Sequence, residues 1–211
     1  MDYCGAQKLT EALLGRDLLG FHPKSDWSAT TLTFYPVPPI PTQNLNERKG
    51  LYLGLATANA FRLGISGPGQ KDGLFTNTGS LHPGRFVICD SFGVKKVTIA
   101  PGKTVMAGSP ILYYRADPTK KKFDGAGGIP PGSLDIYNFT DNFNLIQVAD
   151  LEDGTPPGDH PLVTAGGTYF YNPRYKIVDQ KILSATKTRW PHRPDSYILI
   201  SAGVDNLYGT S

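Results

Sequence analysis

The stretch Arg193-Pro-Asp-Ser-Tyr-Ile-Leu-Ile-Ser-Ala-Gly-Val-Asp-Asn-Leu-Tyr-Gly-Thr210 lies near the carboxyl end of the 211-residue chain and decides the predicted fold. Residues 196–201 are rich in β-branched and aromatic side chains and contain no glycine or proline, which predicts a β-strand. Residues 202–209 contain two glycines and an Asp-Asn pair, and such residues favour turn backbone. A strand followed by a tight turn is therefore expected here.

A helix is expected at the opposite end of the chain. Within residues 4–20, Ala6, Leu9 and Leu13 follow one another at three- and four-residue steps, which is typical of one apolar helix face. A glycine at the end of this range and a proline shortly after it supply a stop signal. The stripe fits either a helix packed on its own domain or an interface, and Leu9 and Leu13 are the candidate interface residues.

Between these two ends, short strands and long loops are expected, together with a few short helices. Strands are predicted at residues 85–90, 95–100 and 109–116, with a turn at Pro101-Gly102. An extended proline-rich connector is expected at 34–43, and an irregular segment at 64–84. Helical structure is expected at three places: a weak helix or loop at 51–63, a short helix or turn at 135–146, and a helix at 173–185. Loops are expected at 117–132 and 153–167. The predicted class is α+β, with one antiparallel sheet and no βαβ rhythm.

Composition supports a folded domain with much irregular backbone. The chain has 24 glycines and 18 prolines, well above ordinary usage, and they follow no fixed period. With 11 tyrosines and 10 phenylalanines available for a core, general disorder is not expected. No run approaches the ~18 consecutive apolar residues of a membrane span, and the first residues do not form a signal peptide.

Charge and cysteine usage exclude several functions. The net charge is only +3, and the densest basic run, Lys120-Lys121-Lys122, lies in a loop, so nucleic acid is not an expected partner. Cys4 and Cys89 form no zinc-like cluster with histidine. They could pair in an oxidising compartment, although Cys89 lies in an apolar run and is interpreted as a small buried hydrophobe.

No local signature of catalysis is found. Each of the four histidines adjoins a proline, which is typical of extended loops. The glycine-rich stretches at 64–69 and 125–128 lack the lysine and the helix start of a phosphate-binding loop. The Asp205-Asn206 pair offers hard oxygen ligands of the kind calcium prefers, although a plain turn explains the same residues.

Three stretches resemble bacterial prepilin-type proteins, including the pseudopilins of type II secretion. Residues 193–210 resemble the family's carboxyl-terminal Tyr-x-Leu-x-Ser-x-Gly-x-Asp-Gly signature, residues 4–21 resemble the segment after the hydrophobic pilin helix, and residues 106–116 fit a bacterial branch. The resemblance implies one pilin-like headgroup domain over residues 1–211, with an N-terminal helix packed on a small antiparallel sheet. Its parts are the helix end (1–21), a loop-rich segment (22–84) and a sheet-containing portion (85–211).

The same resemblance implies a function as a structural subunit. Such proteins are cleaved by a prepilin peptidase and keep an apolar helix that sits in the inner membrane before it packs in the filament core. We expect a leader and this apolar segment to precede the present sequence in the full precursor. The implied role is a non-enzymatic subunit of a type IV pilus-like or type II secretion filament, with other pilins as partners, in the periplasm or at the cell surface.

The resemblance also implies a calcium site in the last loop, with Asp205 as the side-chain ligand and Asn206 as a helper. Two departures weaken this implication. Asn206 stands where the family has glycine, and the sequence ends at Ser211, where further acidic ligands would be expected. No other cofactor is expected.

Two alternatives remain open at this point. An exported carbohydrate-binding module could use exposed aromatic residues, such as Trp27, Trp190 or the patch at 169–171. A hydrolase would need a cleft with convergent histidine and carboxylate groups, for which the sequence gives no signal.

Overall fold

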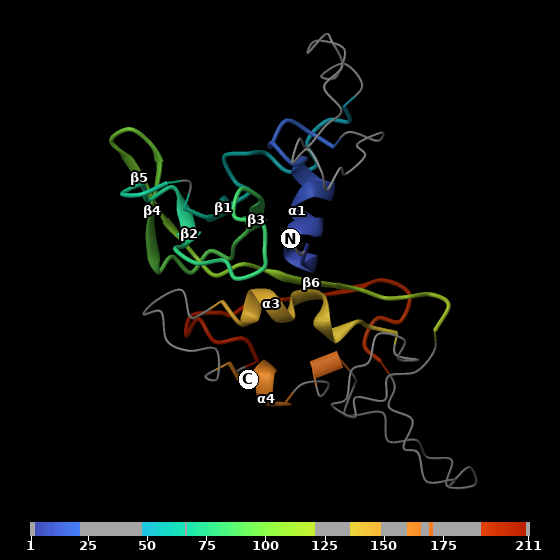
Figure 1. Cartoon of the computed structure of the whole chain (residues 1–211). Helices are drawn as coiled ribbons and strands as arrows, with labels where there is room; N and C mark the ends of the chain where they lie inside the picture. Colours follow the sequence, from blue (N-terminus) through green and yellow to red (C-terminus); the bar gives the residue numbers. More distant parts are fainter. Residues whose placement is uncertain are drawn as a thin grey trace, which may run out of the picture.

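The computed structural model of the chain describes residues 3–21, 48–65, 67–120, 136–148, 160–165, 169–170 and 191–209. This part combines short helices with three small sheets. In Figure 1, helix α1 stands above strand β6, the β4–β5 hairpin projects on the left, and α3 and α4 lie below β6. The expected connector at 34–43, the helix at 173–185 and both tryptophans lie outside the described residues.

Helix α1 (Gly5–Leu14) is shorter than the helix expected at residues 4–20. It ends at Gly15, whose positive φ of 82° directs the chain away from the helix axis. The buried face of the helix consists of Gly5, Ala6, Gln7, Thr10 and Leu14, whereas Leu9 and Leu13 are half-buried. The buried stripe is thus rotated from the expected one, because polar Gln7 and Thr10 are buried through hydrogen bonds.

The first sheet has the order β2-β1-β3, with bounds β1 (Ala60–Gly64), β2 (Gly73–Phe75) and β3 (Phe86–Ile88). Strand β1 pairs antiparallel with β3 but parallel with β2, so the expected single antiparallel sheet is not what the structure has. Strand β1 lies in the expected helix or loop at 51–63, and β2 lies in the expected irregular segment. A Cβ on Gly73 would lie 2.2 Å from the Gly64 carbonyl, so the parallel pair depends on glycine.

The second sheet is a hairpin of β4 (Lys95–Ala100) and β5 (Lys103–Ala107). The strand expected at 95–100 and the Pro101-Gly102 turn are both confirmed, with φ of 73° at Gly102. Val97 pairs with Val105 on the inner face of the hairpin. The pairing shifts between Thr98 and Ala100, near the hairpin tip.

The third sheet pairs β6 (Leu112–Arg115) antiparallel with β7 (Tyr197–Ile200), and these two strands confirm the ones expected at 109–116 and 196–201. Leu112 lies opposite Ile200 and Tyr114 opposite Ile198, so these four side chains share the inner face. The other edge of β6 meets α1, where a Cβ on Gly5 would lie only 2.0 Å from the Tyr113 carbonyl oxygen. Strand β6 therefore contacts both α1, near the start of the described residues, and β7, near their end.

Three short helices complete the described part: η1 (Phe139–Asn142), α3 (Phe143–Ile146) and α4 (Pro161–Ala165). The first two confirm the short helix expected at 135–146, and α4 lies within the expected loop at 153–167. One apolar core extends from Cys4 to Tyr208, with Phe170 packed edge-on against Tyr114. Within the described ranges, no helix has the length and apolar character needed to cross a bilayer.

Candidate functional site at the carboxyl-terminal turn

The turn after β7 packs back onto the core instead of extending into solvent. Its backbone passes through left-handed conformations at Gly203 and Asn206, with φ of 76° and 58°. Asparagine tolerates this conformation better than most residues with a side chain. The Asn206 N–H donates to the Gly203 carbonyl at 3.4 Å, which closes the turn expected at this position.

The structure turns the two predicted calcium ligands in different directions. Asp205 is exposed, and its Oδ1 accepts a hydrogen bond from the Leu207 N–H at 3.2 Å. Asn206 is only 2 % exposed, and its Oδ1 accepts a hydrogen bond from the Ser109 hydroxyl at 3.1 Å. Asn206 thus serves as a structural link to the chain before β6, while Asp205 and nearby carbonyl groups carry the calcium prediction alone.

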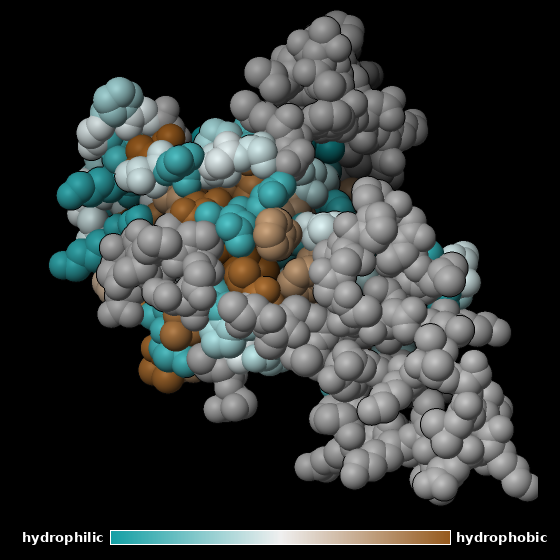
Figure 2. All heavy atoms as spheres, turned by 60° about the horizontal axis from the view of Figure 1, so that its bottom comes forward, coloured by the Kyte–Doolittle hydropathy of each residue, from teal (hydrophilic) through white to brown (hydrophobic). Residues whose placement is uncertain are grey.

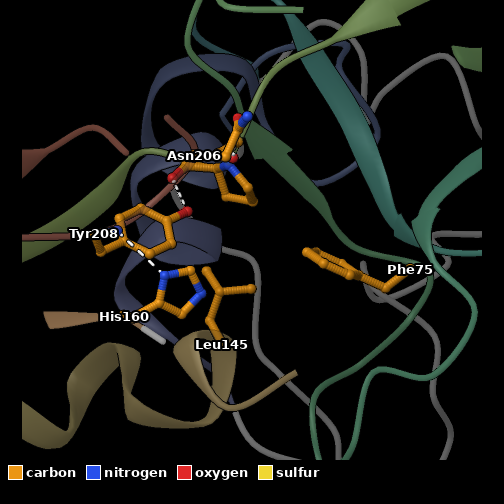
Figure 3. Close-up of a pocket in the computed structure, with 7 residues that line it drawn as sticks. Phe75, Leu145, His160, Asn206 and Tyr208 are labelled. Carbon is orange, nitrogen blue, oxygen red and sulfur yellow. Dashed lines mark hydrogen bonds between the residues drawn. The ribbon is translucent and has the colours of Figure 1, made fainter. Parts of the chain in front are cut away.

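A histidine and a tyrosine form the centre of this site (Figure 3). The Tyr208 N–H donates to Nδ1 of His160 at 3.2 Å, so this nitrogen carries no proton and the ring is held in one tautomer. The Tyr208 hydroxyl donates to the Pro110 carbonyl at 2.5 Å, and burial raises the pKa of this phenol. Both side chains are buried, at 3 % exposure for His160 and 4 % for Tyr208.

A narrow cleft opens beside these groups. Phe75 on β2 and Leu145 on α3 supply its apolar walls, and the polar atoms come from Ser109, His160 and Asn206. The space holds no more than about one water molecule, so it is not a pocket for a small-molecule substrate.

Asp90 makes a second link between the turn and the core. Its Oδ2 accepts a hydrogen bond from the Ser201 hydroxyl at 2.7 Å, and its Oδ1 accepts one from the Phe92 N–H at 3.1 Å. The Asp90 N–H in turn donates to the Ser109 carbonyl at 2.9 Å. Asp90 and Ser109 together hold both ends of the turn.

Each polar group described here has a structural partner. The Ser109 hydroxyl bonds to an amide, the Ser201 hydroxyl to a carboxylate and His160 Nδ1 to a backbone N–H. Among these described groups, a serine and a histidine joined for nucleophilic catalysis are not found. Likewise, no group of three or more His, Cys, Asp and Glu side chains gathers in a metal-binding arrangement within the described part of the chain.

A second polar cluster fastens α1 to the loop before β3. Glu11 lies between two guanidinium groups, with Arg16 Nε at 2.5 Å and Arg85 Nη1 at 3.1 Å, and it also accepts a hydrogen bond from the Tyr3 hydroxyl. The Arg85 guanidinium stacks on the Tyr3 ring at 4.1 Å. Burial is the main cause that raises the pKa of Tyr3 and lowers the pKa of Arg85.

The sequence prediction missed most of these residues. It singled out Asp205 and Asn206 but gave no sign of Ser109, His160 or Asp90, because their partners lie far away in the sequence. Because Pro161 follows it, His160 could be predicted only to have extended backbone. Glu11 and Arg85 are separated by 74 residues, so no local pattern could have paired them.

The aromatic patch proposed for sugar binding belongs partly to the core. Phe170 is fully buried, and the Tyr169 hydroxyl donates to the Gly209 carbonyl. These two rings are therefore not an exposed stacking surface, whereas Tyr171 and both tryptophans lie outside the described residues. Cys4 and Cys89 are buried free thiols, and burial raises the pKa of both, to about 11 for Cys4.

In comparisons with known proteins, no family model, curated protein sequence or solved structure matched this chain.

Proposed function

We propose that the chain is the headgroup of a structural subunit of a type IV pilus-like or type II secretion filament, which acts through contacts with other subunits and cargo and not through catalysis. The proposal includes anchoring of the precursor in the inner membrane and a place in the periplasm or at the cell surface. It rests on the resemblance of residues 4–21, 106–116 and 193–210 to prepilin-type proteins. The attachment of α1 to the head is the structural observation that supports it best.

Buried and partly buried hydrogen bonds attach α1 to the head at several points. The Thr10 hydroxyl accepts from the Ile88 N–H at 2.9 Å, and the Ala6 N–H donates to Asn142 Oδ1 at 2.9 Å. The Gln7 side chain donates to the His82 carbonyl at 3.2 Å. A filament subunit needs such a fixed joint, because its head must follow the helix that holds it in the filament.

The carboxyl-terminal turn supports the same interpretation. Asn206 and Tyr208 bond to Ser109 and Pro110 just before β6, and the Tyr208 N–H also bonds to His160 just before α4. The cleft beside these residues is too small for a substrate. A calcium ion bound at Asp205 would add to this closure and is part of the proposal. Leu9 and Leu13, half-buried on α1, remain the proposed subunit contacts.

The proposal can be tested by expressing the gene with its natural upstream region, with and without a prepilin peptidase. The expected result is peptidase-dependent removal of a leader, measured by mass spectrometry, and recovery of the protein in filaments sheared from the cells. An uncleaved protein that never enters a sheared fraction, although it is folded and abundant, would reject the proposal.

A further inference from the structure

The β4–β5 hairpin belongs to a basic stretch of the sequence. Residues 91–116 contain neither aspartate nor glutamate, and their basic residues are Lys95, Lys96, Lys103 and Arg115. The side chains of Lys96 on β4 and Lys103 on β5 are exposed. The hairpin therefore presents positive charge with no carboxylate of its own.

A third exposed lysine lies beside the hairpin. The Lys71 carbonyl accepts a hydrogen bond from the Thr98 N–H at 2.6 Å, which places Lys71 next to β4. The carboxylate that follows it in the sequence, Asp72, lies 3.9 Å from Arg62 Nε and so faces a cation of its own. The hairpin and its neighbour together carry three exposed lysines.

Exposed apolar side chains lie on the outer face and tip of the hairpin. Met106 is 47 % exposed and lies directly opposite Lys96 in the strand register. Val97 and Val105 pair on the inner face, so the alternation of side chains along a strand places Lys96 and Met106 on the outer face. Ile99, near the tip, is 49 % exposed. The outer surface is therefore both basic and apolar.

This mixture selects the kind of partner. A dry apolar interface would suit the aliphatic side chains but would remove water from the lysines at a high cost. A bilayer with anionic lipid offers phosphates to the lysines and an apolar layer to the aliphatic side chains at the same contact. On the left of Figure 2, the side on which Figure 1 places the hairpin, hydrophilic and apolar residues lie next to one another.

We propose that the outer face and tip of the β4–β5 hairpin bind the surface of a membrane that contains anionic lipid. The three lysines would contact lipid phosphates, while Ile99 and Met106 would enter the boundary between headgroups and acyl chains. Lysine side chains suit this boundary, because their methylene groups cover apolar surface while the charge stays in the headgroup layer. Charge complementarity between the acid-free hairpin and the anionic lipid carries this choice of partner.

The contact goes beyond the proposed filament function and does not depend on it. Each lysine near an anionic surface raises the membrane affinity about fivefold, so three lysines and two aliphatic side chains give a reversible contact. In a precursor anchored in the inner membrane, the head would be held beside the bilayer, and its high local concentration would populate even a weak contact.

Sedimentation of the full 211-residue chain with lipid vesicles tests the contact. The probes are vesicles of phosphatidylcholine alone and vesicles of an equal mixture of phosphatidylcholine and phosphatidylglycerol. We expect binding to the mixed vesicles and at least about fivefold weaker binding to phosphatidylcholine alone. Binding to the mixed vesicles should also fall steeply between about 20 and 500 mM NaCl, because salt screens exposed charges.

Variants without the charges connect the binding to the hairpin. Lys96→Gln with Lys103→Gln should weaken binding to the mixed vesicles about 25-fold, since each lysine contributes about fivefold. Lys49→Gln with Arg115→Gln makes the same change in net charge at exposed positions outside the hairpin and should weaken binding much less. Circular dichroism checks that every variant is folded.

A fluorescent probe reports the apolar part of the contact. A nitrobenzoxadiazole group on Ile99→Cys should become brighter and shift to the blue with the mixed vesicles, because it enters the acyl boundary. The same group on Val204→Cys, which lies at a position 79 % exposed in the carboxyl-terminal turn, should not respond. Cys4 and Cys89 are buried, so labelling of the folded protein is directed to the new thiol.

Several results would overturn the proposal. They are equal sedimentation with both kinds of vesicle, equal losses in the hairpin variant and its control, or a probe at position 99 that does not respond to bound vesicles. A probe at position 99 already shielded from iodide before vesicles are added would show that another part of the chain covers the hairpin. Binding to polyglutamate but not to vesicles would assign the surface to an acidic polymer instead. An absent leader or absent filaments would reject the proposed function while leaving positive vesicle binding valid.

Discussion

Gly5 sets the distance between α1 and β6. A Cβ at this position would lie 2.0 Å from the Tyr113 carbonyl oxygen and 2.8 Å from Nδ2 of Asn142. The nearer atom belongs to the backbone of a buried strand, so it cannot rotate away as a flexible side chain could.

Gly5→Ala should therefore destabilise the fold by about 1–3 kcal/mol, the usual cost of overpacking. Urea unfolding followed by circular dichroism measures this change. Gly50→Ala is the matched control, because nothing lies within 4 Å of its added methyl group. An equal stability for the two variants would contradict the close packing of α1 on β6.

Tyr208 closes the carboxyl-terminal turn through its hydroxyl. Tyr208→Phe removes the donor to the buried Pro110 carbonyl and should cost about 1–3 kcal/mol, because an unsatisfied buried acceptor remains. Thermal unfolding checks this value. Tyr197→Phe makes the same chemical change on an exposed ring, and its effect should stay within about 0.5 kcal/mol. Similar losses in both variants would refute the structural role of Tyr208.

His82 predicts a dependence of stability on pH. Desolvation, followed by the charge of Arg85, lowers the pKa of His82, and its Nδ1 accepts a hydrogen bond from the Gly84 N–H at 3.1 Å. A histidine with a lowered pKa in the folded state stabilises the fold above its unfolded pKa of about 6.5. That stability is lost as pH falls from about 6.5 toward the lowered value.

Urea unfolding of the wild type and His82→Gln at several pH values between 8 and 5 measures this effect. The wild type should lose stability more steeply than the variant as pH falls, because only the wild type gains a proton on unfolding at this position. Parallel curves for the two proteins would show that His82 is not responsible.

At the scale of elements, Glu11 holds α1 to the loop before β3. Glu11→Gln removes the carboxylate that the guanidinium groups of Arg16 and Arg85 both contact, and both arginine side chains are only 6 % exposed. Breaking a buried ion pair in this way costs about 3–5 kcal/mol. Partial access to water puts the expected loss near the lower end of that range.

Asp17→Asn is the control for this prediction. It removes a carboxylate from Arg48, but Asp17 is 38 % exposed, and such surface pairs contribute about 0–1 kcal/mol. Chemical denaturation of both variants gives the comparison. A loss for Glu11→Gln no larger than that for Asp17→Asn would contradict the anchoring role of the cluster.

The elements that the sequence predicted well are those defined by local signals. The β4–β5 turn follows from Pro101-Gly102, and β7 follows from its uninterrupted β-prone residues. Strand β2 has only three residues, and its parallel pairing depends on Gly64 lying against Gly73, which no local pattern reveals. The buried face of α1 differs from the face expected from the apolar residues, because Thr10 is buried through a hydrogen bond with the distant Ile88 N–H.

The candidate site was likewise only partly predictable from the sequence. Glycine, aspartate and asparagine indicated the turn at 202–209, but the sequence could not show that Asn206 points inward. Its partner Ser109 lies 97 residues away, and the hydrogen bond between them forms only when β6 and β7 are paired. Residues whose role is set by such distant partners are predictable only from a structure.

At the scale of the whole molecule, both ends of the described chain meet at β6. Helix α1 packs on one side of this strand and β7 pairs with its other edge, so both elements are held by the same strand. Within the described residues, one apolar core is shared by segments from all three sheets. This arrangement, together with the resemblance to prepilin-type proteins, is the basis for the proposed filament subunit.

The most direct test of that central proposal is to read the gene upstream of the codon for residue 2. The proposal predicts a short basic leader that ends in glycine, followed by phenylalanine or methionine and about twenty apolar residues, long enough to span a bilayer. A natural start at Met1, with no apolar segment encoded before it, would contradict the proposal.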